Sequence, residues 1–349
     1  MAQVTNQTVE QIDAQIKALL KRRADLLKQN HEDDSINNVA LINAFQETTH
    51  KVRDEKHWRD HFERYHEALH NAQQVVEKPC VVYQGAPGAY SEMACMKFFG
   101  PDSFAIGLHR FDDAFEALAN NGADYAVLPI ENSSTGAIRQ IYDLLSQYDC
   151  YIVGETTVKV SHNLMALPGT KLEDIKTVYS HEQGLFQCEK FLRQYDWLGI
   201  AKGDTAGSAK MVADFKDHHK AAIASSRAAE IYGLEILVPN INTNSHNTTR
   251  FVVIAPRMEL RPNRDKICIS ITTANEVGAL HEILSIFALY GLNLTRIESR
   301  PIPERNWEYM FFIEFTGDLL GEGMDEVMKE LTQSVNDIRV FGNFESNLD

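Results

Sequence analysis

Residues 125–136 read YAVLPIENSSTG, an apolar run that ends in a cluster of hydrogen-bonding side chains. The run through Ile130 has the length and the composition of a buried β-strand. The polar side chains after it are more numerous than a turn or a helix cap requires. In open α/β sheets, ligands bind at the carboxyl ends of the strands. This stretch therefore predicts an α/β fold with a ligand site at the end of the strand.

Short β-branched runs flank this stretch on both sides and alternate with amphipathic segments. Strands that alternate with helices indicate an α/β domain with a largely parallel sheet. We place this domain at residues 79–256. The expected strands are CVVYQG at 80–85, YIVGETTV at 151–158, KTVYSH at 176–181, AAIASS at 221–226, EILV at 235–238 and RFVVIA at 250–255.

Residues 1–78 are a segment of a different kind, because they contain neither glycine nor proline. Apolar residues recur in this segment at the three- and four-residue spacing of one helical face. We expect a helical bundle over these residues. The apolar positions that define the face are Val9, Ile12, Ile16, Leu19 and Leu26.

A charged segment with two prolines, residues 256–262, indicates a linker before a third domain at 264–345. In that domain Ile267, Ile269 and Ile271 alternate as in a strand with one buried and one exposed face. The order of the expected elements is βαββαβ, a ferredoxin-like arrangement. The strands are expected at 267–274, 294–301, 309–317 and 338–345, and the helices at about 278–290 and 324–335.

The composition argues against several classes of protein. The formal net charge is −15 and no basic patch is present, which argues against a nucleic-acid partner. The five cysteines are dispersed without a CxxC pair, so we expect reduced thiols and no disulfide framework. No apolar run approaches the ~20 residues of a membrane span, and the start does not resemble a signal peptide. We therefore expect a cytoplasmic protein without a membrane partner.

Two histidine pairs have a spacing that is compatible with a metal ion. His57 and His61, and likewise His66 and His70, are four residues apart and would share one face of a helix. No carboxylate or cysteine completes either set, so we interpret these side chains as a solvated polar face. The sequence predicts no metal site.

The pattern of a strand end followed by polar residues recurs in three further segments: YQGAPGAYS at 83–91, YSHEQ at 179–183 and GDTAG at 203–207. A fourth polar segment, NTTRF at 247–251, leads into an apolar strand. Helix N-termini at such places present free N–H groups to anions. In the first segment, Ser91 is expected to cap the following helix and to bind an anion. In the second, His181 is either a group that titrates near neutral pH or a structural residue.

Taken together, these motifs resemble the prephenate dehydratase family: YQGAPGAYSE, ADYAVLPIENSSTG, SHEQGLFQC, GDTAGSA, AAIASSRAAEIYGL and NTTRF follow in the family's order and spacing. The resemblance covers about residues 80–256. It implies two α/β subdomains around a cleft, like a periplasmic binding protein, with the chain crossing between them more than once. It also implies decarboxylative dehydration of prephenate to phenylpyruvate, a step of L-phenylalanine biosynthesis, without a cofactor.

The chemistry of this substrate explains the residue types. Prephenate is a dianion whose ring hydroxyl leaves as water and whose ring carboxylate leaves as CO2. The site must hold two carboxylates without neutralising the one that leaves. By resemblance to the family's TRF motif, Thr249 donates a hydrogen bond to the leaving hydroxyl, and Arg250 orients the site or binds a carboxylate. Substrate-binding roles are assigned to Ser91, Glu131, Asn132, Ser133, Gln183 and Thr205.

Two motifs of the third domain, GALHEIL at 278–284 and ESRP at 298–301, resemble an ACT regulatory domain. The resemblance implies a feedback site for L-phenylalanine at the interface of a homodimer or homotetramer. A helix N-terminus at Gly278 suits the carboxylate of an amino acid. The alternative is a ferredoxin-like domain that only dimerises. The implied effector residues are Gly278, Ala279, Leu280, Glu298, Ser299, Arg300 and Pro301.

The first domain resembles the helical chorismate mutase that precedes the dehydratase in bifunctional relatives. Residues 12–23 match its first helix and Arg23 matches the family's arginine, but Asn6 stands in place of another expected arginine. Chorismate is a dicarboxylate, and a mutase needs several cations to bind it. The segment is therefore either a divergent mutase that acts through Arg23 and Arg53 or, as we favour, a remnant that serves dimerisation.

A rival hypothesis from another class is a non-catalytic amino-acid sensor or solute-binding protein on the same scaffold. The NTTRF motif favours the enzyme, because a protein that only binds has no need of a threonine beside the other polar groups. The sequence thus predicts a phenylalanine-regulated prephenate dehydratase with a mutase-like helical segment.

Overall fold

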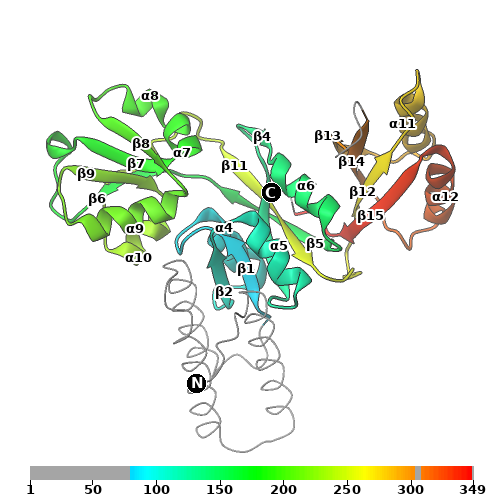
Figure 1. Cartoon of the computed structure of the whole chain (residues 1–349), viewed down its shortest axis with the longest axis horizontal. Helices are drawn as coiled ribbons and strands as arrows, with labels where there is room; N and C mark the ends of the chain where they lie inside the picture. The colour runs from blue at the N-terminus through cyan, green and yellow to red at the C-terminus, as the bar shows by residue number, and fades with distance from the viewer. Residues whose placement is uncertain (1–78, 303–307, 348–349) are drawn as a thin grey trace, which may run out of the picture. The chain divides into compact units, whose positions relative to one another are not determined.

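A computed structural model describes residues 79–302 and 308–347. The predictions for residues 1–78, including the helical bundle with Arg23 and Arg53, lie outside these described residues. The described chain is organised around three β-sheets with helices packed on them (Figure 1). Its longest helices have 11 residues, and none of the described helices is long and apolar enough to span a bilayer.

The first sheet contains the YAVLPIENSSTG stretch. Its strands are in the order β2-β1-β3-β11-β5, and the short β4 pairs with β3. Helix α4 packs on one face and helices α5 and α6 pack on the other, because successive residues of each strand alternate between two apolar cores. The bounds are β1 Val81–Gln84, α4 Tyr90–Phe99, β2 Ala105–Leu108, α5 Phe111–Ala119, β3 Tyr125–Asn132, β4 Gly136–Ala137, α6 Arg139–Gln147, β5 Tyr151–Lys159 and β11 Thr248–Ala255.

The second sheet forms the other subdomain, with its strands in the order β10-β6-β9-β7-β8. Small side chains on α9 and α10 pack closely against this sheet and against the first subdomain, in one continuous apolar core. The bounds are β6 Asn163–Ala166, η2 Leu172–Asp174, β7 Thr177–His181, α7 Glu182–Gln187, α8 Glu189–Leu192, β8 Leu198–Lys202, α9 Thr205–Phe215, β9 Lys220–Ala224, α10 Ser226–Tyr232 and β10 Glu235–Val238.

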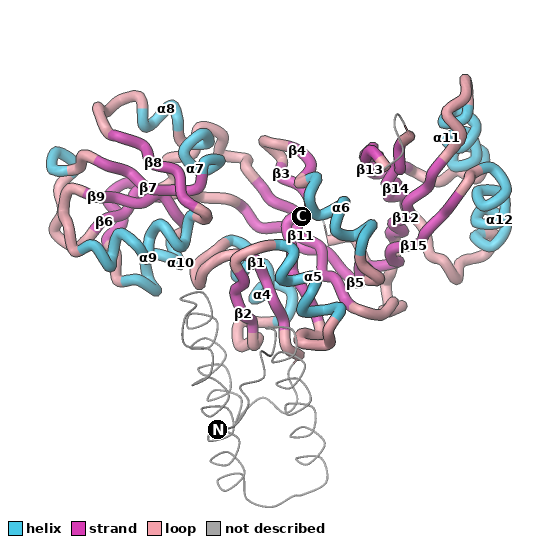
Figure 2. The backbone as a smooth tube through the Cα atoms, in the orientation of Figure 1, coloured by secondary structure: helices cyan, strands magenta, loops and turns pink. Residues whose placement is uncertain are grey.

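The chain passes between these subdomains twice, from β5 to β6 and from β10 to β11 (Figure 2). This confirms the predicted pair of subdomains with more than one crossing. The prediction of a largely parallel sheet is confirmed with one exception in each sheet: apart from the two-residue β4, a single strand, β11 or β6, runs against the other four. Strand β11 is antiparallel to β3 and β5, and β6 is antiparallel to β9 and β10. The reason is that β11 returns from the other subdomain and enters the first sheet from the opposite end.

The third sheet confirms the predicted βαββαβ order, with its strands arranged as β13-β14-β12-β15. Helices α11 and α12 pack on one face of it through the three isoleucines of β12. The bounds are β12 Lys266–Thr272, α11 Ala279–Leu289, β13 Leu294–Pro301, β14 Tyr309–Thr316, α12 Met324–Ser334 and β15 Asp337–Phe344.

The expectation that β12 has one exposed face was wrong, because every residue of β12 is buried. Its second face contacts the first subdomain instead of solvent. Cys268, Phe312, Phe341 and Phe344 from this face share one apolar core with α5 and α6. The third domain therefore docks on the first subdomain through the face that an isolated ferredoxin-like sheet would leave in water.

Two contacts at the edge of this junction are especially close. The backbone of Gly342 in β15 lies against the carbonyl of Ile152 in β5, which leaves no room for a side chain. The guanidinium of Arg339 donates to the carbonyls of Leu145 at 3.2 Å, Tyr148 at 2.9 Å and Cys150 at 3.1 Å. Arg339 thus binds carbonyls at the C-terminal end of α6 and in the segment that leads to β5.

We predict that Gly342→Ala destabilises the protein by ~2 kcal/mol or more, because the new methyl group collides with backbone that cannot rotate away. Urea unfolding of the full chain measures the effect. Gly199→Ala is the matched control, since Gly199 also lies in a strand but its Cβ would meet only Leu185 side-chain atoms at 3.8 Å. Equal stabilities of the two variants would contradict the close approach at Gly342.

Candidate functional site

Three of the predicted site residues come together where the end of β3 lies beside the start of β11. The register pairs Thr249 directly with Asn132. The amide of Asn132 donates to Thr249 Oγ1 at 2.9 Å and to Asn247 Oδ1 at 2.7 Å. The hydroxyl of Ser133 accepts from the backbone N–H of Thr248 at 2.9 Å. The strand end and the NTTRF motif thus form one polar network.

The Asn132 side chain is fixed at both of its ends. Its carbonyl oxygen accepts from the backbone N–H groups of Ser134 at 2.9 Å and Thr135 at 3.2 Å, in the turn that leads to β4. This is the hydrogen bonding that makes asparagine favourable in turns. Because its oxygen is occupied by the turn, the amide group of Asn132 is oriented toward β11.

The hydroxyl of Thr249 retains a free proton. Thr249 is 8% exposed, and its oxygen accepts the hydrogen bond from Asn132. A threonine hydroxyl also carries one donor, and in the described residues no acceptor receives it. Thr249 can therefore donate to a bound ligand without breaking any hydrogen bond of the protein.

A cavity of about 540 Å³ adjoins this network between the two subdomains. The buried Asn247, which is 1% exposed, contributes an amide nitrogen without a hydrogen-bond partner in the described structure. Lys190 contributes an ammonium group for which the described residues supply no counter-ion. An unpartnered buried donor and a free cation suit an anionic ligand. The lining residues are Ser133, Ser134, Phe186, Gln187, Glu189, Lys190, Arg193, Thr243, Asn244 and Asn247.

Of the residues that line this cavity, sequence reasoning assigned a site role only to Ser133, and it missed Gln187, Lys190 and Asn247 among others. Gln187 and Asn247 lie inside the SHEQGLFQC and NTTRF motifs, so a signal for them was present. Gln187 Oε1 lies 2.9 Å from Nε2 of His162, a buried ring. Burial lowers the pKa of His162 to about 4, so this ring is neutral at neutral pH and donates to Gln187. Lys190 lies outside the motifs and was not recognisable without the fold.

The prediction that Ser91 caps a helix was wrong. Helix α4 begins one residue earlier, at Tyr90, and its N-cap is Ala89 without a side-chain hydrogen bond. The carboxylate of Glu92 accepts from the N–H of Gly88 at 2.8 Å instead and pairs with Arg227 of α10 at 2.9 Å. Ser91 itself is buried. The YQGAPGAYSE motif thus serves partly to join the two subdomains.

Gln183 and Thr205 lie in the second subdomain, at the first turns of α7 and α9. His181 is the N-cap of α7, where its Nδ1 accepts from the N–H of Gln183 at 3.2 Å. This contact favours the structural interpretation of His181. Among the described residues, no hydrogen bond connects Ser91, Gln183 or Thr205 with the Asn132 network, so their predicted roles in substrate binding stay predictions.

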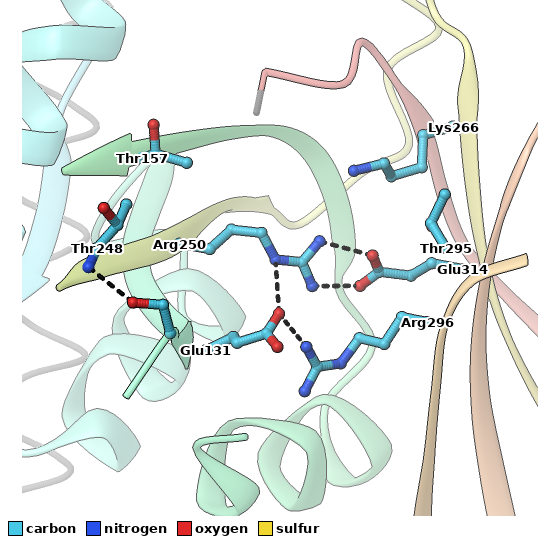
Figure 3. A pocket seen from close by; sticks show the side chains of 9 residues that line it. Glu131, Thr157, Thr248, Arg250, Lys266, Thr295, Arg296 and Glu314 are labelled. Carbon is cyan, nitrogen blue, oxygen red and sulfur yellow. Dashed lines mark hydrogen bonds and ion pairs between the residues drawn. The ribbon is translucent and has the colours of Figure 1, made fainter. Parts of the chain in front are cut away.

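Arg250 and Glu131 do not line this cavity; they line a second one together with residues of the third domain (Figure 3). Arg250 donates to both carboxylate oxygens of Glu314 in β14, at 2.6 Å and 2.7 Å, and to Glu155 at 2.9 Å. Glu131 pairs with Arg250 at 3.5 Å and with Arg296 of β13. The carboxylates that Arg250 binds in this structure therefore belong to the protein. The predicted substrate roles of Arg250 and Glu131 stay predictions.

A β-bulge explains why Glu131 lies on this side. The register between β3 and β11 shifts by one residue, because Phe251 pairs with Pro129 whereas Arg250 pairs with Glu131. Ile130 is therefore an extra residue in β3. A bulge redirects the side chains that follow it. It places Glu131 on the side of Arg250 and leaves Asn132 on the side of Thr249.

The predicted effector residues occupy two exposed places on the third domain. Gly278 has a φ of 94° and precedes α11, and the turn around it is exposed. In β13, Ser299 and Pro301 are exposed, whereas Glu298 and Arg300 face α6. Arg300 makes two hydrogen bonds of 2.7 Å to Asp143 of α6. This motif therefore contacts the first subdomain as well as solvent.

Comparison with known proteins agrees with this architecture. The sequence profile of the family described as Prephenate dehydratase matches residues 81–259, just over half of the chain, and the profile of the ACT domain matches residues 269–333. Arogenate dehydratase 3, chloroplastic, of Arabidopsis thaliana is 42% identical over 284 residues, which cover 76% of this chain and 66% of that protein. The chain thus spans slightly less than two thirds of the length of this relative.

Two solved structures are similar over most of the described chain. GqqA, described as a novel type of quorum quenching acylase, gives a TM-score of 0.71 at 29% identity and covers 77% of this chain and 98% of its own. The prephenate dehydratase of Arthrobacter aurescens, solved in complex with L-Phe, gives a TM-score of 0.70 at 28% identity, with coverages of 76% and 90%. Because one fold carries such different activities, function must be argued from the residues of the site.

We predict that the stability of the protein falls as the pH falls through the acidic range. Burial raises the pKa of Glu314, but the hydrogen bonds and charge of Arg250, with Lys266 and Arg296, outweigh burial and hold this pKa below its ordinary value of 4.5. A carboxyl whose pKa is lower in the folded state stabilises the protein above its unfolded pKa, and this contribution is lost on acidification.

Urea unfolding at pH 6 and pH 4 measures this effect. The loss of unfolding free energy between the two pH values should be smaller in Glu314→Gln than in the wild type, because the glutamine cannot titrate. Identical losses in the two proteins would show that Glu314 is not a source of the pH dependence.

Proposed function

Because this chain belongs to the prephenate dehydratase family, we propose that it catalyses the decarboxylative dehydration of prephenate to phenylpyruvate. In this reaction the bond to the ring hydroxyl and the bond to the ring carboxylate both break. The electron pair of the second bond completes the aromatic ring as CO2 departs, and the hydroxyl leaves as water after it takes up one proton from solvent. The site must hold two carboxylates and supply a hydrogen-bond donor at the leaving oxygen.

The observation that carries this proposal is the hydrogen bond from Asn132 to Thr249 at 2.9 Å. It occupies a lone pair of the Thr249 hydroxyl and leaves the proton of that hydroxyl for the substrate. A hydroxyl that accepts a hydrogen bond is polarised into a better donor. Threonine is a weak acid, so its role is to stabilise charge on the departing oxygen by a preorganised hydrogen bond.

The cavity beside this network supplies ligands for a carboxylate. The unpartnered amide of Asn247 and the hydroxyl of Ser134, which accepts from Asn244 at 3.2 Å, are neutral donors. Lys190 adds one positive charge at the same cavity. Neutral donors bind a carboxylate without removing the negative charge that drives its departure, so they suit the ring carboxylate. The charged Lys190 suits the side-chain carboxylate, which does not react.

Arogenate is a second candidate substrate. The relative with 42% identity is named an arogenate dehydratase. Arogenate has the same reacting ring as prephenate and carries an amino group in place of the keto group of the side chain. The same Thr249 hydroxyl would serve both reactions, and the product from arogenate would be phenylalanine itself.

We further propose that the third domain binds L-phenylalanine and that the chain acts as a homodimer or homotetramer in the cytoplasm. The match to the ACT profile and the likeness to a prephenate dehydratase that was solved with L-Phe support the effector. The chorismate mutase prediction concerns residues outside the described structure and is tested by adding chorismate to the same assay.

We predict that the wild-type protein converts prephenate, arogenate or both, and that Thr249→Val lowers kcat at least ~100-fold with little change in KM. Valine has the shape of threonine but cannot donate to the leaving oxygen, and loss of one such donor commonly has this effect. Formation of phenylpyruvate or phenylalanine from each substrate measures kcat and KM.

Thr248→Val is the control for Thr249→Val. Thr248 is the preceding residue of the same strand, its side chain lies at the opposite cavity, and kcat should change less than about twofold. Full activity of Thr249→Val would exclude Thr249 from the mechanism. A wild-type protein that converts neither substrate would overturn the proposed function.

We predict that Arg300→Ala and Asp143→Ala both weaken inhibition by L-phenylalanine, because the pair joins the ESRP motif to α6. Calorimetry then separates two roles of Arg300. If Arg300 only transmits the effect, both variants bind L-phenylalanine within about threefold of the wild-type affinity. If Arg300 is itself a ligand, Arg300→Ala loses affinity ~10-fold or more whereas Asp143→Ala does not. Unchanged inhibition in both variants would show that the Arg300–Asp143 pair does not couple L-phenylalanine binding to the activity.

A further inference from the structure

We propose that the third domain contributes positioning residues to the dehydration reaction. Glu314 of β14 and Arg296 of β13 bind the two charged residues, Arg250 and Glu131, that adjoin the catalytic pair Thr249 and Asn132 in sequence. The inference rests on the proposed function, because it assigns to Glu314 and Arg296 an effect on the same Thr249 hydroxyl.

The register of the two strands is the first step of the argument. Thr249 pairs with Asn132, and the next pair along the ladder is Arg250 with Glu131. Successive residues of a strand point to opposite faces, so the two pairs are one residue apart but face different partners. The first pair is bonded to Asn247, which lines the cavity between the subdomains, and the second pair faces the third domain. A displacement of the second pair therefore moves the backbone that carries the first.

The contacts of Arg250 are the second step. Its guanidinium binds both oxygens of Glu314, at 2.6 Å and 2.7 Å, which determines its orientation as well as its position. Glu131 lies between Arg250 and Arg296, so two side chains of the third domain and two of the first subdomain alternate in charge (Figure 3). Each strand that carries a catalytic residue is thus held by one residue of the third domain.

The surroundings complete the cluster. Glu155 of β5 is fully buried and pairs with Arg250 at 2.9 Å and with Lys266 of β12 at 2.5 Å. Three cations and three carboxylates therefore balance one another. A cavity of about 240 Å³ borders them, and removal of one member leaves the others free to rearrange into this space. The cluster comprises Glu131, Glu155, Arg250, Lys266, Arg296 and Glu314.

Docking of the domain alone does not account for such a cluster. Phe312, Phe341 and Phe344 already bury the domain against α5 and α6. Buried ion pairs contribute less to stability than well-packed apolar residues of similar volume, because both charges lose their hydration. What a bidentate charged contact adds is a unique geometry, and the strand that it orients is β11, which carries Thr249 near its start.

The test compares steady-state kinetics of full-length variants with prephenate and arogenate. Glu314→Gln keeps the size of the side chain but removes its charge, and we expect kcat to fall ~10-fold with KM within about twofold. Glu314→Asp keeps the charge on a shorter side chain and should lower kcat ~3-fold. A residue that only stabilises the fold would lower the melting temperature and leave the kcat of the folded protein unchanged.

Asp318→Asn is the matched control. Asp318 lies in the same domain and binds Arg264 at 2.7 Å, but this pair does not contact the catalytic strands. Its kcat should stay within about twofold of the wild-type value. If Glu314→Gln does not fold, the kcat of Glu314→Asp alone tests the inference. If the wild type is active and the folded Glu314 variants have an unchanged kcat, this inference is overturned and the proposed function stands. If the wild type is inactive, both the proposed function and the inference are overturned.

Discussion

The buried guanidinium of Arg250 determines how the described parts of the chain fit together. It lies between Glu155 of its own sheet and Glu314 of the third domain, so that neither carboxylate is buried without a countercharge. An unpaired charge at this depth would cost several kcal/mol. The strands β5, β11 and β14 must therefore be placed so that Arg250 reaches both carboxylates. The cleft network of Asn132 and Thr249 is built on the opposite face of the same strands.

Local sequence patterns were sufficient to predict most of the architecture. The βαββαβ order, the two subdomains and the polar ends of β3 and β11 all follow from apolar runs, turn residues and motif order. These features depend on residues that are close in sequence, where periodicity and propensity are informative. The grouping of Asn132, Ser133 and Thr249 follows for the same reason, because each lies at the end of a recognisable strand.

The features that the sequence did not reveal are those that depend on distant partners. Cys268 and Ser270 looked like the exposed face of a strand, because nothing local indicates that a second domain covers them. Glu131 looked like a member of the polar cluster, because a one-residue bulge at Ile130 has no signature in the sequence. Lys190 belongs to a cavity formed by segments from both subdomains, and its neighbours there are visible only in the folded chain.

The shared apolar core has a consequence for how such a protein can evolve. Regulatory domains are often exchanged between enzymes as independent modules, which requires that each module present a polar surface to its neighbour. Here Phe312, Phe341 and Phe344 complete a core that begins in α5 and α6, and the carbonyl of Ile152 leaves no room for a side chain at Gly342. A transplanted domain would have to match both surfaces at once. We therefore infer that the third domain and the first subdomain diverge as a pair, with compensating substitutions on the two sides of the junction.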